Sequence, residues 1–143
     1  MLSNTTKYAL KAVLYLAVHS SEDHKILAKD ISKPINVPQA YIAKLLQELS
    51  RHHVVTSAKG PGGGFYLSAQ NRRTPLLTIV GILDGDKRLN SCMLSIHACN
   101  ENHPCPLHKL VGQTKLNFIK NLEETTIADL VEDIAAQRSF LPV

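Results

Sequence analysis

The feature that most constrains the fold is the glycine-rich stretch KGPGGG at residues 59–64, which lies between two short runs of β-prone residues. These runs are VVTS at 54–57 and FYLS at 65–68. Glycine reaches positive φ without steric cost, so the pattern predicts a β-hairpin with a glycine tip. The stretch is not a Walker loop, because no GK[ST] follows it and no helix begins there. A plain flexible turn would look the same locally, so the preceding segment decides its meaning.

Three helical segments are expected before the hairpin. Apolar residues at helical spacing predict the first helix at about 5–20, and a third helix begins at about Pro38. Their inner faces carry Leu10, Val13, Leu14 and Ala17 in the first helix and Ile42, Leu45, Leu46 and Leu49 in the third. Between them we expect a very short strand at 26–27 and a helix from Ala28 that ends near Lys33, before Pro34. Three helices followed by a hairpin is the order of a winged helix-turn-helix, so we expect a mostly α fold with a small β-hairpin wing.

This arrangement predicts a DNA-binding surface on the third helix and the wing. Residues 1–73 contain ten Lys or Arg and four acidic residues, whereas residues 74–143 contain six and eight. A basic first half favours a polyanionic partner, and Lys59 would reach a minor groove. The alternatives are an ordinary amphipathic core helix and solvated surface charges. The candidate DNA-binding residues are Gln39, Ala40, Tyr41, Lys44, Arg51, Lys59, Gly60, Gly62 and Gly63.

After Arg73 the chain changes character. LLTIVGILDG predicts a short buried helix ending at Gly85, and residues 107–122 predict a longer helix. In the final helix, Thr126 is the expected N-cap and Asp129 lies three residues further on, close to a capping box. The stripe of the longer helix consists of Leu107, Leu110, Val111, Thr114, Phe118 and Leu122. We therefore divide the chain into a DNA-binding unit at 1–84, a cysteine-rich loop at 85–106 and a helical unit at 107–143.

The loop holds all three cysteines of the chain. Six residues separate Cys92 from Cys99, five separate Cys99 from Cys105, and His108 lies three positions beyond Cys105. An odd number of cysteines cannot pair completely, so metal ligation or redox sensing is the expected role. Soft thiolates suit Zn²⁺ or an iron–sulfur cluster, and three cysteines with one histidine complete a four-ligand set for either. The spacing alone does not distinguish these options, although the CxxC knuckles typical of structural zinc sites are missing.

Composition excludes several other classes. The apolar segment YALKAVLYLAV is interrupted by Lys11, and no run approaches the ~20 residues of a membrane span. Trp is absent and aromatic residues make up 5% of the chain, which argues against a stacking platform for single-stranded nucleic acid. No oxyanion-forming motif accompanies the thiols, so we expect no catalytic residues and no enzyme. We expect a cytoplasmic protein without a membrane partner.

Four segments together resemble the Rrf2 family of bacterial transcription regulators. They are TTKYALKAVLYLA, VPQAYIAKLLQEL, KGPGGGFYLS and the three-cysteine loop, and the resemblance covers about residues 2–135. It implies a winged-helix homodimer that binds double-stranded DNA at a pseudo-palindromic operator, with the helix at 107–122 in the dimer interface. In IscR-like members three cysteines and a nearby histidine bind a [2Fe–2S] cluster. The resemblance thus assigns Cys92, Cys99, Cys105 and His108 as its ligands, whereas His97 and His103 match no ligand position.

Three departures from the family pattern keep alternatives open. The first cysteine gap is one residue longer than in IscR-like members, so cluster geometry or type could differ. Lys7 stands where NsrR-like members commonly carry an Asp that ligates a [4Fe–4S] cluster, and Ala43 stands where IscR-like recognition helices carry a Glu. The alternatives to a [2Fe–2S] sensor of cluster status, redox or oxygen are a nitric-oxide-sensing NsrR-like repressor and a zinc or thiol switch.

Overall fold

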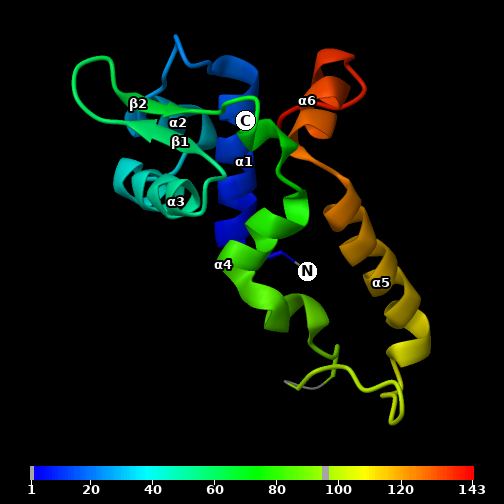
Figure 1. The fold of residues 1–143 in the computed structure, drawn as a ribbon. Helices are drawn as coiled ribbons and strands as arrows, with labels where there is room; N and C mark the ends of the chain where they lie inside the picture. The colour runs from blue at the N-terminus through cyan, green and yellow to red at the C-terminus, as the bar shows by residue number, and fades with distance from the viewer. Residues whose placement is uncertain (1, 95–96) are drawn as a thin grey trace.

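The computed structural model describes residues 2–94 and 97–143. Within these ranges it contains six α-helices, one short 3₁₀ helix and one two-stranded sheet (Figure 1). The elements are α1 (Asn4–His19), α2 (Ala28–Ile35), α3 (Gln39–Arg51), β1 (Thr56–Ala58), β2 (Gly64–Tyr66), η1 (Asn71–Arg73), α4 (Leu76–Asn90), α5 (His108–Glu124) and α6 (Ile127–Ala135). The predicted order of three helices and a hairpin is confirmed, as are the long helix and the final helix.

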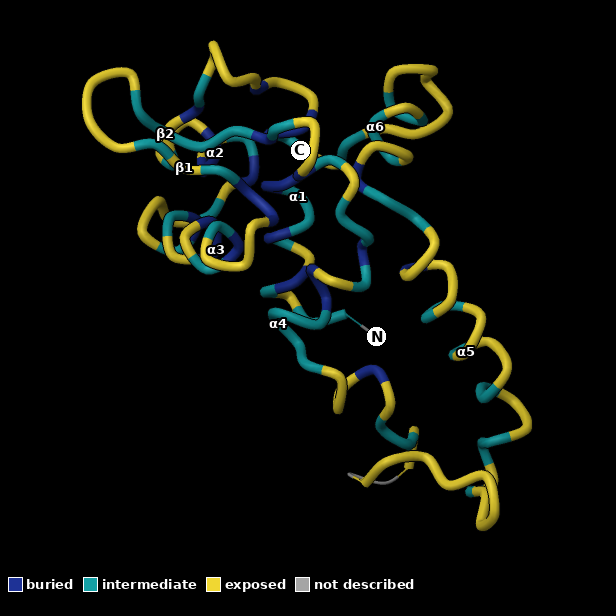
Figure 2. Tube along the Cα trace, viewed as in Figure 1, coloured by how far each residue is buried: buried dark blue, intermediate teal, exposed yellow. Residues whose placement is uncertain are grey.

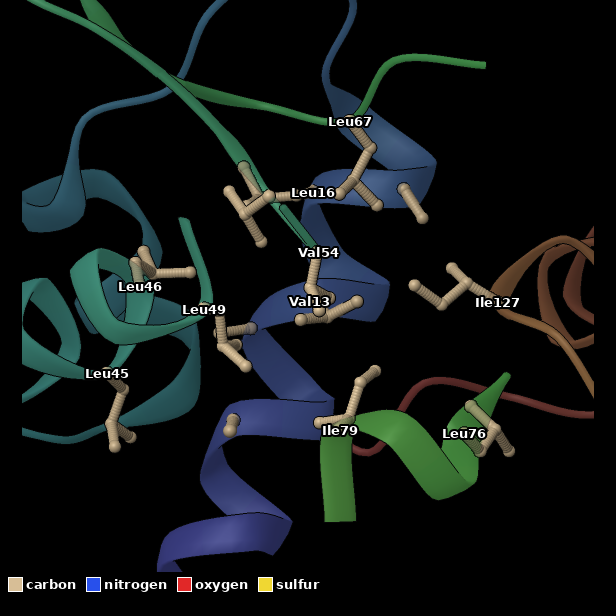
Figure 3. Packing of buried hydrophobic residues seen from close by; sticks show 14 of the residues in the cluster. Val13, Leu16, Leu45, Leu46, Leu49, Val54, Leu67, Leu76, Ile79 and Ile127 are labelled. Carbon is tan, nitrogen blue, oxygen red and sulfur yellow. The ribbon is translucent and has the colours of Figure 1, made fainter. Parts of the chain in front are cut away.

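Helix α1 is the centre of the hydrophobic core. Residues from α3, the hairpin, α4 and the start of α6 surround it, as shown by Leu49, Leu67, Ile79 and Ile127 around Val13 (Figure 3). The predicted stripe of α1 is only half right: Val13 and Ala17 are buried, but Leu10 and Leu14 are partly exposed. The fully buried positions also include Ala9, Ala12 and Leu16. The sequence pattern misplaces this face because alanines weigh little in a hydrophobicity pattern, yet they let neighbouring helices approach closely.

The predicted end of α2 at Lys33 is wrong. The helix continues through Pro34 to Ile35 and ends at Asn36, whose φ of 60° and ψ of 53° are left-handed. Proline costs one intrahelical hydrogen bond near the end of the helix, but its fixed φ is helical. Ile31 and Ile35, four residues apart, are both buried, and this packing holds the last turn in place.

The hairpin pairs β1 with β2 in antiparallel register, with Thr56 opposite Tyr66 and Ala58 opposite Gly64. The short strand expected at 26–27 is reduced to a single bridge. In it the Ile26 amide donates to the Phe65 carbonyl at 2.9 Å, and the Phe65 amide donates back at 2.8 Å. This bridge anchors β2 to the segment that enters α2, so the hairpin has a fixed position relative to the helices.

Helix α4 bends at Gly85, which adopts φ 73° and ψ 163°. The prediction of a helix end at Gly85 finds this break but misses the helical turn that follows it, up to Asn90. The connection between α4 and α5, residues 91–107, is called the cysteine segment below; it lies at the end of the molecule remote from the hairpin tip (Figure 1). Only Leu122 of α5 is buried, so most of the helix is exposed (Figure 2). In the described part of the chain, no helix combines the length and hydropathy needed to cross a bilayer.

The chain returns to the core after α5. The Leu76 amide donates to the Thr125 carbonyl at 2.9 Å, and the Ile127 amide donates to the Thr74 carbonyl at 3.1 Å. Helix α6 begins with the predicted capping box between Thr126 and Asp129. These bonds fix α6 against the start of α4, and α5 projects as an arm between them and the cysteine segment.

Candidate functional site

Helix α3 presents a polar outer face opposite its buried one. Gln39, Ala40 and Lys44 are exposed, whereas the four apolar residues predicted for the inner face are all buried. Gln47 is also exposed, and it lies on this face because it is three positions after Lys44. The sequence interpretation missed Gln47, although its helical spacing from Ala40 and Lys44 was a sufficient signal.

Tyr41 does not extend freely from the outer face. Its ring lies edge-on to Tyr8 of α1, with centroids 6.0 Å apart, and its hydroxyl donates to Thr5 Oγ1 at 3.1 Å. Tyr41 therefore ties the start of α3 to the first turns of α1. At the other end of α3, Arg51 makes an exposed ion pair with Glu48.

The tip of the wing depends on its glycines for backbone reasons. Gly60 and Gly62 have φ of 85° and 72°, a region that L side chains rarely adopt. The Gly63 amide donates to the Gly60 carbonyl at 2.9 Å, and a Cβ on Gly63 would lie 2.4 Å from the Ala58 carbonyl oxygen. Only glycine fits at the tip of this turn, which carries the exposed Lys59 outward at its start.

A buried asparagine holds the wing against α3. Asn71 is 6% exposed, and its Oδ1 accepts from Thr56 Oγ1 at 2.7 Å and from the Ser68 amide at 2.9 Å. Its Nδ2 donates to the His53 carbonyl at 2.8 Å, just beyond α3. One side chain thus joins the end of α3, β1 and the segment after β2. Sequence reasoning missed it, because an asparagine in a polar segment resembles a surface residue.

The basic residues of the first half differ in their roles. Arg72 donates to the carbonyl of Ala17 at 2.6 Å and to that of Ser20 at 3.2 Å, where α1 ends. It therefore satisfies carbonyls that a helix C-terminus leaves unpaired, and it counts as a structural residue. Lys44 and Lys59 remain exposed and able to meet phosphates.

The cysteine segment closes on itself at its first half. The Cys92 amide donates to the His97 carbonyl at 3.0 Å, and the Cys99 amide donates to the Asn90 carbonyl at 3.1 Å. Ser91 and Ala98 form an antiparallel bridge between these two bonds. The backbone therefore brings Cys99 back to the end of α4.

The structure brings two of the four candidate ligands together. Cys99 Sγ lies 3.1 Å from His108 Nδ1. His108 is the first residue of α5, and its amide donates to the Cys105 carbonyl at 3.0 Å. Among the described residues, no three His, Cys, Asp or Glu side chains are placed to share one metal ion. The donor types fit a soft metal or an iron–sulfur cluster, but Cys92 and Cys105 would have to move to complete the set.

A groove of about 580 Å³ lies beside this pair, with Cys99, His108, Gly112 and Leu116 among its lining residues. A Cβ on Gly112 would lie 3.4 Å from His108 Nε2, so the glycine leaves room for the imidazole. Sequence reasoning missed Gly112, although a glycine four residues after a candidate ligand on one helix was the signal. His103 is exposed, and its amide donates to Asn100 Oδ1 at 3.2 Å.

The fold and the outer surface of α3 and the wing define a winged-helix regulator of the DNA-binding class. Comparison with known families is consistent with this: residues 2–133 match the family Rrf2, described as "Iron-dependent Transcriptional regulator". The chain therefore belongs to the Rrf2 family, and the predicted resemblance is confirmed. Members of this family are transcription regulators, which also confirms the expectation that the protein is not an enzyme.

Individual relatives extend over nearly the whole chain. A protein of Aquifex aeolicus (strain VF5), provisionally named an HTH-type transcriptional regulator, is 32% identical over 133 residues, which are 92% of this chain and 91% of the relative. The HTH-type transcriptional regulator NsrR of Geobacillus kaustophilus (strain HTA426) is 27% identical over 145 residues, covering 98% of this chain and 95% of NsrR. The solved structure of T. potens IscR has the same fold, with a TM-score of 0.71 at 20% identity, covering 97% of this chain and 91% of IscR.

Proposed function

We propose that this protein is a homodimeric transcription regulator whose affinity for a pseudo-palindromic operator is set by an iron–sulfur cluster in the cysteine segment. The observation that carries the proposal is the 3.1 Å contact between Cys99 and His108, which gathers half of a Cys₃His set at the start of α5. The family description as iron-dependent supports iron as the metal. The remaining ligands would be Cys92 and Cys105, and we propose a [2Fe–2S] cluster because the Cys₃His set resembles that of IscR-like members; the ligand count itself fits [4Fe–4S] as well.

DNA would meet the outer face of α3 in the major groove and the wing in the minor groove. Positions 39, 40, 44, 59, 60, 62 and 63 lie in or beside these elements, with Tyr41 and Arg51 at the two ends of α3. Phosphate contacts by lysines release counterions, so operator affinity should fall steeply as salt rises. We also propose that the protein is cytoplasmic, because a bacterial transcription regulator acts on chromosomal DNA.

The dimer would form through α5. Leu110 is 73% exposed and Leu116 is 55% exposed on this arm, although both are large and apolar. Exposed apolar residues on the outward side of a helix favour a protein interface. We accordingly propose that residues 1–84 bind DNA, residues 85–106 hold the cofactor with His108, and residues 107–143 comprise the dimerisation helix and the C-terminal helix.

The cluster would supply a redox-sensitive link that joins Cys92 and Cys105 to the Cys99–His108 pair. Drawing Cys92 and Cys105 toward Cys99 and His108 would reshape the segment between α4 and α5. Because α5 would lie in the dimer interface and α4 begins in the DNA-binding unit, this change would alter the spacing of the two recognition helices.

The test is anaerobic purification followed by assays of iron, sulfide and zinc and a visible spectrum. About two irons and two sulfides per chain, with absorption above about 400 nm, are expected for [2Fe–2S]. Operator affinity should then differ between cluster-loaded and cluster-free protein. One zinc per chain, or no metal after reconstitution, would refute the cluster and leave the winged-helix assignment intact.

A thiol switch without a cluster is the second candidate, since neither Cys99 nor Cys105 forms a disulfide in the structure. The change His108→Ala separates the two functions. It should abolish or weaken metal binding in a cluster or zinc site, whereas a pure disulfide switch would keep its response to oxidant.

A further inference from the structure

The N-terminus of α1 is fastened to the bend in α4 by one serine and one aspartate, 81 positions apart in the chain. The Ser3 amide donates to Asp84 Oδ2 at 3.0 Å, and the Ser3 hydroxyl donates to Asp84 Oδ1. The same hydroxyl accepts from the Thr6 amide at 3.1 Å and caps α1. One side chain therefore fixes the first turn of α1 and binds the carboxylate of α4.

This carboxylate is held in its ionised form. Burial raises the pKa of Asp84, but the hydrogen bonds from the Ser3 hydroxyl and amide, the nearby Thr6 hydroxyl and the charge of Arg88 together lower it below its ordinary value. The hydroxyl of Thr6 is completely buried and makes no hydrogen bond within the described structure, so it acts on the carboxylate only as a nearby dipole. A charged acceptor strengthens both bonds from Ser3.

Asp84 immediately precedes the bend at Gly85. Apart from the adjacent backbone of its own helix, no atom of the described residues lies within 4 Å of the position that a Cβ on Gly85 would occupy, so no packing contact of these residues blocks a change of the bend there. Beyond it, the turn from Asp86 to Asn90 leads into the cysteine segment, where the Cys99 amide donates to the Asn90 carbonyl. Lys115 of α5 donates to the Ser91 carbonyl at 2.6 Å. The turn is thus attached to α1 at one end and to the candidate ligand segment and α5 at the other.

The first turns of α1 also contact the recognition helix. Thr5 accepts the hydrogen bond from the Tyr41 hydroxyl, and Tyr8 packs edge-on against the ring of Tyr41. Both residues follow Ser3 in the turns that it caps. A continuous chain of contacts therefore runs from the cysteine segment through Asp84 and Ser3 to the start of α3.

We propose that the Ser3–Asp84 contact transmits the state of the cysteine segment to the recognition helix through the first turns of α1 and Tyr41. The proposal rests on the proposed function, because it needs a loop whose state changes. Ser3 and Asp84 are positioning residues in this scheme. They touch neither the cofactor nor DNA, and they set where the start of α3 lies relative to the rest of the dimer.

The experiment compares wild-type protein with Asp84→Asn and with Asp86→Asn as the matched control. Asp86 is exposed, lies on the other side of the bend and loses the same charge. Affinity for one operator fragment is measured by fluorescence anisotropy for cluster-loaded and cluster-free protein, and cluster content is checked by visible absorption. Coupling of this kind is typically about 5–150-fold in affinity. The affinity ratio is the affinity of the tighter-binding form divided by that of the weaker-binding form. We expect this ratio to fall to less than about a fifth of the wild-type ratio in Asp84→Asn, and to stay unchanged in Asp86→Asn.

A second readout follows the contact itself. Hydrogen exchange at the Thr6 and Lys7 amides, which bond to Ser3, should differ between loaded and cluster-free wild-type protein. In Asp84→Asn this difference should vanish. If Asp84→Asn does not fold, Ser3→Ala replaces it, because Ser3→Ala keeps the backbone bond to Asp84. It removes the hydroxyl that also accepts from the Thr6 amide, so in this variant exchange is read at the Lys7 amide alone.

The outcomes separate the two hypotheses. A wild-type protein whose affinity is the same with and without the cluster overturns the proposed function and the coupling with it. A wild-type protein that responds, with Asp84→Asn responding equally in both affinity ratio and hydrogen exchange, overturns the coupling alone. Loss of the response in Asp84→Asn with its retention in Asp86→Asn supports both.

Discussion

Replacing Asn71 with Ala tests whether one buried amide sets the position of the wing. The change removes the bond from Thr56, leaves the Ser68 amide and hydroxyl without their acceptor and leaves the His53 carbonyl without its donor. Each of these four bonds contributes about 1 kcal/mol net, so the free energy of unfolding should fall by about 4 kcal/mol. With a urea m-value of about 2 kcal/mol/M, the midpoint should fall by about 2 M.

The assay is urea denaturation followed by circular dichroism, at one fixed protein concentration because dimerisation contributes to stability. Gln70→Ala is the matched control: it also removes an amide side chain, but from an exposed position on the adjacent residue. Gln70→Ala should shift the free energy by no more than about 0.5 kcal/mol. If Asn71→Ala cost less than about 1 kcal/mol, the amide would not be what fastens the wing, and this reasoning would be wrong.

Three further changes probe other parts of the molecule. The folded pKa of Asp84 lies below its ordinary value of 3.8, so the ionised carboxylate stabilises the folded state fully at pH values above 3.8. In urea titrations at several pH values, wild type should be more stable than Asp84→Asn above pH 3.8, and the difference should disappear as pH falls through the folded pKa. A difference that stays constant with pH would contradict this. Gly64→Ala should destabilise the fold by about 1–3 kcal/mol in thermal unfolding, because Gly64 has φ 144° and a Cβ would lie 2.8 Å from the Ile26 carbonyl oxygen; an unchanged melting temperature would show that the bridge can shift. Leu110→Glu with Leu116→Glu should halve the mass measured by light scattering without lowering helix content, and an unchanged mass would place the dimer interface elsewhere.

Much of the candidate DNA surface could be predicted from the sequence because it depends on short-range patterns. The spacing of Ile42 and its neighbours fixes which face of α3 is buried, and the glycine run fixes where the hairpin turns. The orientation of Tyr41 could not be predicted in this way. Its half-buried position depends on Tyr8 and Thr5, which belong to another helix and are brought near only by packing.

The sequence by itself determined the order of helices and strands, the capping box of α6 and the inventory of soft ligands, because helical period, capping and residue chemistry are local properties. Tertiary structure alone decided that Cys99 meets His108 and that Asp84 holds Ser3 at the start of α1. It also decided that Asn71 is a buried connector and that Leu110 remains exposed. These features join residues far apart in the chain or depend on what covers them, and such contacts form only when whole elements pack against one another.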